Sequence, residues 1–243
     1  MPPRNSISEF VTTVIPRSIR QLVSSSQDYD TSKFDHVFSG MSVWIEPEFS
    51  QEMNEKMSFL QQECGGESRG VSPFVPHVTL LYNIPMDKFK DPKEVLTKCW
   101  NDFQSKGVCT GEKESKGSIT AVDWGCFVYP KSADNGKGFG CSISFLWINL
   151  SPWLNVLQKS CEEHFGAGER KGFIPHLSLV YAPEDCEVFL QRFTDEQRRD
   201  QVSLNQDIRI KYLSLWSTEG RMCDWYPIAK IPISDLEDSS DAI

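Results

Sequence analysis

One nine-residue phrase occurs twice in this chain, and it constrains the fold more than any other feature. Residues 74–82 read Phe-Val-Pro-His-Val-Thr-Leu-Leu-Tyr, and residues 173–181 read Phe-Ile-Pro-His-Leu-Ser-Leu-Val-Tyr. Two of the four histidines of the chain, His77 and His176, occupy the same position in the phrase. Two copies of one histidine–hydroxyl unit predict a site that is assembled from both halves of a duplicated fold.

Each phrase predicts a strand with one apolar face and one reactive face. The residue before each proline is pushed into extended backbone, and the residues that follow are apolar and β-prone. Residues i and i+2 of a strand face the same side. His77 therefore shares a face with Thr79, and His176 shares a face with Ser178. We expect the opposite faces, which carry valine and leucine, to pack against helices.

The elements around the two phrases follow one order, which predicts a duplicated α+β unit of two lobes. Each half reads as a strand, a capped helix ended by glycine, the histidine strand, a second helix and a further strand, and a last strand closes the chain. The expected strands, besides the histidine phrases, are 42–46, 118–129, 141–150, 208–217 and 225–233. The expected helices follow Ser50 and Ser151, end at Gly65 and Gly166, and cover 92–103 and 183–193.

The two ends differ in composition from residues 41–233, which we expect to form a single bilobal domain. Residues 1–40 lack hydrophobic periodicity, and up to Gln27 their only acid is Glu9. That composition fits a poorly ordered leader and also resembles an organelle transit peptide. Residues 234–243 carry four acids and no base, as in a solvated acidic tail.

The overall charge and the cysteine pattern exclude several classes of protein. A net charge of −9 gives no global field that would gather long nucleic acid. No run of 18 apolar residues predicts a membrane span. The eight cysteines include no C-x-x-C pair and no zinc spacing. We therefore expect reduced cysteines, no metal or other cofactor, and a cytoplasmic monomer.

The reactive faces suit phosphate chemistry. A hydroxyl such as that of Thr79 or Ser178 can donate a hydrogen bond to a phosphate oxygen. Imidazole, with an ordinary pKa near 6.5, can move protons at neutral pH. Across a phosphorus atom, one neutral ring of the His77–His176 pair could take a proton from water while the other, protonated, gives one to the departing oxygen. The residues alone leave open which ring is the acid and which is the base.

Other candidate residues have simpler interpretations. Strict alternation places Tyr82 and Tyr181 on the apolar face, although a bulge could redirect one of them. His164 is expected at a helix C-terminus, where positive charge is favourable, and His36 lies in the leader. The glycine-rich run at 135–140 lacks the phosphate-loop pattern and leads into a strand, so it predicts a hinge or hairpin.

The two motifs His77-Val78-Thr79-Leu80 and His176-Leu177-Ser178-Leu179 resemble those of the two-histidine phosphoesterases. With the preceding prolines, the Ser-Val-Trp-Ile strand and the late Leu-Ser-Leu-Trp strand, the similarity is to plant and yeast cyclic phosphodiesterases. It covers roughly residues 40–233. It implies two antiparallel sheets flanked by helices, with a central cleft that both motifs line.

The resemblance also implies an activity and roles. It implies hydrolysis of ADP-ribose 1″,2″-cyclic phosphate to ADP-ribose 1″-phosphate, a late step of tRNA-splicing metabolism, and of nucleoside 2′,3′-cyclic phosphates to 2′-phosphates. His77 and His176 would be the acid–base pair, Thr79 and Ser178 would hold phosphate oxygens, and Tyr181 would contact the small cyclic-phosphate substrate. The alternatives are an RNA-end-processing enzyme of the same superfamily and a nucleotide-binding module without catalysis.

Overall fold

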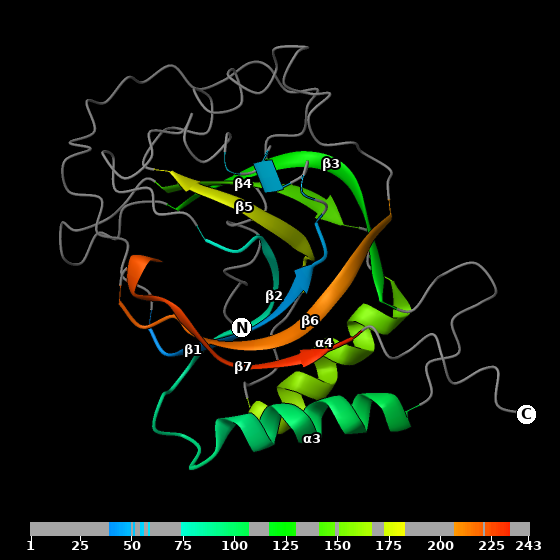
Figure 1. Cartoon of the computed structure of the whole chain (residues 1–243), viewed down its shortest axis with the longest axis vertical. Coiled ribbons are helices and arrows are strands. Elements are labelled where there is room, and N and C mark those ends of the chain that lie inside the picture. The colour runs from blue at the N-terminus through cyan, green and yellow to red at the C-terminus, as the bar shows by residue number, and fades with distance from the viewer. Residues whose placement is uncertain are drawn as a thin grey trace, which may run out of the picture.

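The fold is α+β, and a computed structural model describes its secondary structure over eight parts of the chain (Figure 1). The described residues are 39–49, 74–106, 117–129, 141–148, 151–166, 173–182, 207–220 and 222–233, together with 51, 54, 55 and 58. The elements are β1 (Met41–Pro47), β2 (His77–Ile84), α3 (Pro92–Ser105), β3 (Ser118–Tyr129), β4 (Cys141–Ile148), α4 (Pro152–Phe165), β5 (His176–Ala182), β6 (Asp207–Ser217), the 3₁₀ turn η3 (Met222–Asp224) and β7 (Tyr226–Pro232).

The described strands form one curled antiparallel sheet in the order β1-β2-β5-β4-β3-β6-β7, and β1 also pairs with β6. Six strands therefore pair in a ring, and β7 is added on β6. The expectation of two separate sheets is wrong. Strands of the first half pair with strands of the second half at four places, which are β1–β6, β2–β5, β3–β4 and β3–β6. β2 and β5 each begin at a histidine and run antiparallel, and they pair through their first residues.

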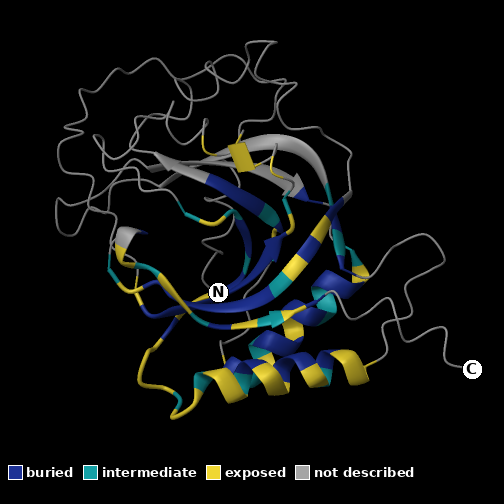
Figure 2. Ribbon diagram, in the orientation of Figure 1, coloured by how far each residue is buried: buried dark blue, intermediate teal, exposed yellow. Residues whose placement is uncertain are grey.

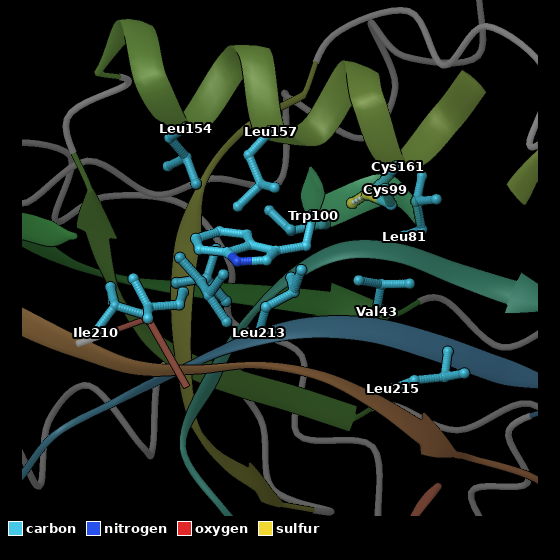
Figure 3. Close-up of a cluster of buried hydrophobic side chains, with 14 of the residues drawn as sticks. Val43, Leu81, Cys99, Trp100, Leu154, Leu157, Cys161, Ile210, Leu213 and Leu215 are labelled. Atoms are coloured by element: carbon cyan, nitrogen blue, oxygen red, sulfur yellow. Dashed lines mark hydrogen bonds between the residues drawn. The ribbon is translucent and has the colours of Figure 1, made fainter. Parts of the chain in front are cut away.

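Helices α3 and α4 cover the outer, apolar face of the curl beneath β6 and β7 (Figure 1). Figure 3 shows Leu154 and Leu157 of α4 and Trp100 of α3 directed toward Leu213 of β6 and Val43 of β1. Each of these side chains is at least 94% buried, and burial of one leucine contributes about 1.5–3 kcal/mol. The helices therefore hold the sheet from outside, while their own outer faces stay exposed (Figure 2).

The boundaries of α4 follow from its sequence. Ser151 is the extended N-cap residue, Pro152 occupies the first helical position, and Gly166 ends the helix in left-handed backbone with φ of 58°. The Ser151 hydroxyl makes no capping hydrogen bond. Lys88, in the connection between β2 and α3, donates to the carbonyl oxygens of Phe165 and Gly166 at 2.7 and 3.0 Å. It thereby satisfies groups that a helix end leaves unpaired.

Most of the expected elements are confirmed, with boundaries shifted by one to two residues. Residues 51, 54, 55 and 58 are helical, but the rest of the helix after Ser50, the helix 183–193, the leader, the acidic tail and the glycine-rich run lie outside the described residues. The bilobal duplication therefore stays a prediction. Neither described helix has the length and apolar character that crossing a bilayer requires.

Candidate active site

Strand pairing brings both histidine–hydroxyl units to one place on the inner face of the sheet. His77 of β2 lies opposite Ser178 of β5, and Val78 lies opposite Leu177. Directly opposed residues of an antiparallel pair share a face, with Cβ atoms about 4.5–5.5 Å apart. Thr79 and His176 are each two residues along the strand from this pair and so lie on the same face. The four residues therefore share one face of the paired strands β2 and β5.

Both imidazoles make the same kind of hydrogen bond, from Nδ1 to the backbone carbonyl oxygen two residues earlier. Nδ1 of His77 lies 2.7 Å from the carbonyl oxygen of Val75, and Nδ1 of His176 lies 3.0 Å from that of Ile174. A carbonyl oxygen only accepts hydrogen bonds, so the proton of each neutral ring resides on Nδ1. The lone pair is therefore on Nε2. Each ring thus has an Nε2 atom that can accept a proton and, when protonated, can donate one.

Burial favours the neutral form of both rings. Burial lowers the pKa of His77 to about 3; the hydrogen bond to Val75 opposes this shift, and the neighbouring His176 adds to it. Burial also lowers the pKa of His176, against the hydrogen bond to Ile174. His77 is 1% exposed, whereas His176 is only half-buried.

A wall of aromatic rings encloses His77. The Trp44 ring stacks on the imidazole with centroids 3.6 Å apart and planes 9° apart, and Phe74 meets it edge-on at 5.5 Å. Trp44 also stacks on Trp216 with centroids 4.9 Å apart, and Trp225 meets Trp44 edge-on at 5.7 Å and Phe74 at 6.3 Å. This wall removes water from His77, which is the physical cause of its low pKa.

The sequence motifs assign no functional role to Trp44, although the alternation of its strand carries a signal for one. The alternation of the first strand places Ser42, Trp44 and Glu46 on one face. Trp44 pairs with Thr79, so this face is the one that carries His77. A polar and aromatic face on a strand whose other face is apolar could therefore have suggested a contribution of β1 to the site.

The two hydroxyls and the two tyrosines of the phrases differ in position. Ser178 is fully buried and Thr79 is half-buried.

The interpretation of Tyr82 as a core residue is wrong, because its side chain is 58% exposed. The register of the β1–β2 pairing shifts near Tyr82, and this shift disturbs the alternation. In β5 a register shift separates Ser178 from Val180, which pairs with Ser144, and Tyr181 follows opposite Ile143. The parity argument that placed Tyr181 on the apolar face therefore does not extend past this irregularity.

Two further features of the described residues bear on the interpretation. His164, near the end of α4, has Nε2 3.4 Å from Asp102 Oδ2 on α3 and belongs to the helix pair rather than to the site. Within the part of the chain that the structure describes, no group of three or more His, Cys, Asp or Glu side chains is arranged to hold a metal ion.

Comparison with known sequences shows similarity to a protein family and to a curated relative. The family described as "Cyclic phosphodiesterase-like protein" matches residues 39–116, a segment that contains β1, β2, α3 and the first histidine phrase. The cyclic phosphodiesterase of Arabidopsis thaliana is 26% identical over 141 residues. That match spans 58% of this chain and 64% of the Arabidopsis protein.

Solved structures of E. coli LigT are similar to this fold at low sequence identity. The apo form has a TM-score of 0.39 and 11% identity, and covers 79% of this chain and 96% of LigT. The complex with 3′-AMP has a TM-score of 0.41 and 12% identity, and covers 81% of this chain and 98% of LigT.

Proposed function

Because the chain belongs to the two-histidine phosphoesterase superfamily, we propose that it is a metal-independent cyclic phosphodiesterase. Its substrates would be ADP-ribose 1″,2″-cyclic phosphate, which yields ADP-ribose 1″-phosphate, and nucleoside 2′,3′-cyclic phosphates, which yield 2′-phosphates. Residues 41–233 would act as one bilobal domain, with the substrate in a central cleft. The observation that carries this proposal is the placement of His77 and His176 on paired antiparallel strands, each with Nδ1 within hydrogen-bond distance of a backbone carbonyl of its own phrase.

The reaction balances with the two imidazoles as the only proton carriers. Water attacks phosphorus and gives a proton to Nε2 of the neutral ring. The bond from phosphorus to the ribose 3′ oxygen breaks, and the protonated ring donates its Nε2 proton to that oxygen, which leaves a 2′-phosphate and a free 3′ hydroxyl. Each transfer is typically worth about 10²–10⁴-fold in rate. Thr79 and Ser178 would donate to the non-bridging oxygens, and Tyr181 would contact the nucleoside.

The lowered pKa values predict the pH at which the site is active. The competent state of the free enzyme carries one proton on the His77–His176 pair, and this state is most populated between the two pKa values. Both pKa values lie below 6.5, so kcat/KM should peak on the acidic side of pH 6.5 and fall as the pH rises. Bound cyclic phosphate is anionic and raises the pKa of a nearby imidazole, so the kcat profile should lie at higher pH. Initial rates measured from pH 4 to 9 test both statements; a kcat/KM optimum above pH 6.5 would contradict the first, and a kcat profile at the same or a lower pH would contradict the second.

The activity itself is tested by product analysis. Purified protein is incubated in EDTA with ADP-ribose 1″,2″-cyclic phosphate and, separately, with 2′,3′-cyclic AMP, and the position of the product phosphate is determined by ³¹P NMR. Formation of the 1″-phosphate and of the 2′-phosphate supports the proposal. Faster opening of an oligonucleotide 2′,3′-cyclic end would favour the RNA-processing alternative. Binding without turnover would favour a module that has lost catalysis.

Removal of a hydroxyl should slow the reaction less than removal of an imidazole. A hydrogen bond to a charged group is worth about 1.5–3 kcal/mol, so Thr79→Ala or Ser178→Ala should lower kcat/KM by about 10- to 100-fold. Thr97→Ala on α3 is the matched control, since its hydroxyl donates to the Lys93 carbonyl on an exposed helix face. Equal kcat/KM values for all three variants would show that the Thr79 and Ser178 hydroxyls take no part in the reaction.

A further inference from the structure

A buried carboxylate lies near the aromatic wall and takes no part in the proposed proton transfers. Glu46 of β1 is 3% exposed. Its Oε1 accepts a hydrogen bond of 2.7 Å from Nε1 of Trp216, and its Oε2 lies 2.6 Å from Nζ of Lys230 on β7. A buried carboxylate is tolerated when it is paired and hydrogen-bonded. Both oxygens of Glu46 meet that condition, so its charge is compensated.

Glu46 is connected to His77 by a continuous series of contacts. The Trp216 ring that it holds stacks on Trp44 at 4.9 Å with planes 27° apart, and Trp44 stacks on His77 at 3.6 Å. The Trp216 N–H also donates to Ser214 Oγ at 3.1 Å. The indole plane is therefore fixed by two acceptors, and the Trp44 ring lies between that fixed plane and the imidazole.

Lys230 contributes to the same arrangement from the exposed side. Its Nζ lies 5.0 Å from the centroid of the Trp216 ring and 5.3 Å from that of Tyr212. A cation over an indole face is attracted to the ring. Glu46 and Lys230 together thus restrain both the edge and the face of Trp216.

From these contacts we propose that Glu46 is a positioning residue for His77, which acts through the stacked rings of Trp216 and Trp44. The rate of a catalysed reaction depends steeply on where the reacting groups lie, and a misplacement of about 1 Å can lower it about 10²-fold. Without Glu46, Trp216 loses the shorter of its two hydrogen bonds and Lys230 loses its carboxylate partner, so the ring that supports Trp44 is less firmly held and water reaches the imidazole. As a positioning role in the reaction, this inference rests on the proposed cyclic phosphodiesterase function.

The variants distinguish three effects: a changed orientation of the Trp216 ring, the loss of the Glu46 charge, and unfolding. Glu46→Leu removes the acceptor, whereas Glu46→Gln retains an oxygen for the Trp216 N–H. Trp216→Phe keeps a stacking ring and removes the donor. Glu48→Leu is the matched control, because Glu48 lies two residues further along the same segment and is exposed.

Two measurements test the proposal, one of them without turnover. In histidine NMR without substrate, with the His77 signal assigned from His77→Gln, Glu46→Leu should raise the titration midpoint of His77 by about one pH unit or more, as water reaches the ring. In the cyclic-phosphate assay kcat should fall about tenfold, with KM changed less than about twofold. Glu46→Gln should stay close to the wild type in the His77 titration midpoint and in kcat, and Glu48→Leu should match the wild type in both quantities.

The possible results distinguish a failure of the positioning role of Glu46 from a failure of the proposed cyclic phosphodiesterase function. A folded Glu46→Leu protein with the wild-type His77 titration and kcat overturns the positioning role. If Glu46→Leu does not fold, Trp216→Phe decides, because an unchanged His77 titration in that variant also overturns it. If the wild-type protein has no turnover, the proposed function fails, whereas the NMR titration still tests whether Glu46 positions His77.

Discussion

Replacement of His77 or His176 by alanine is expected to lower kcat for cyclic-phosphate hydrolysis by about 10²–10⁴-fold each, since each variant loses one proton transfer. The two losses should be far from additive, because the acid and the base act as a unit. Single-turnover measurements with 2′,3′-cyclic AMP in EDTA, on both single variants and the double variant, give the three rates. Each ring's Nδ1 bonds to the backbone of its own phrase, so neither substitution removes an Nδ1 hydrogen bond to another strand.

His164→Ala is the matched control for these variants. His164 is a half-buried histidine whose Nε2 lies 3.4 Å from Asp102 on the neighbouring helix, so its loss should leave the hydrolysis rate within about twofold, as for most substitutions away from a site. Near-normal turnover in His77→Ala or His176→Ala would contradict the shared site. Equal losses in all three variants would indicate unfolding rather than chemistry, which circular dichroism would detect.

Gly40→Ala should be among the most destabilising single substitutions in the chain. Gly40 precedes β1 with φ of 72°, and a Cβ atom there would collide with the backbone oxygen of Ile84. The backbone cannot easily move away, because the Gly40 N–H donates to Glu219 at 2.6 Å and its carbonyl accepts from the Thr218 N–H at 2.9 Å. Left-handed strain of about 1–2 kcal/mol adds to an overpacking cost of about 1–3 kcal/mol.

The measurement is thermal or urea unfolding of both glycine variants. A loss of about 3 kcal/mol corresponds to a Tm lowered by about 6–12 °C in a chain of this size. Gly117→Ala is the control, since Gly117 also has positive φ, of 90°, but its added Cβ would meet only the Ile233 side chain at 3.5 Å. It should cost only the strain of about 1–2 kcal/mol. Equal losses in the two variants would show that the collision with Ile84 is relieved.

Much of the local structure could be read from the sequence because it depends on neighbours along the chain. The alternation in each phrase placed His77 with Thr79 and His176 with Ser178. Pro152 and Gly166 marked the ends of α4. These are consequences of a backbone that repeats every two residues in a strand and every 3.6 in a helix, so they hold before any long-range contact is known.

Where alternation breaks, the same reasoning fails. Tyr82 is exposed because the pairing of β2 with β1 shifts register beside it, and the pairing of β4 with β5 shifts before Tyr181. Such irregularities depend on both strands of a pair and have no signature in either strand alone.

The sequence by itself determined that this chain has two equivalent histidine strands and which side chains share a face with each histidine. Only the tertiary structure decided that β2 and β5 pair so that His77 lies opposite Ser178, that one sheet contains both halves, and that Trp44 from β1 covers the imidazole. The physical reason is that side-chain direction follows from local backbone geometry, whereas strand partners and stacked rings depend on which distant segments bury their apolar faces together.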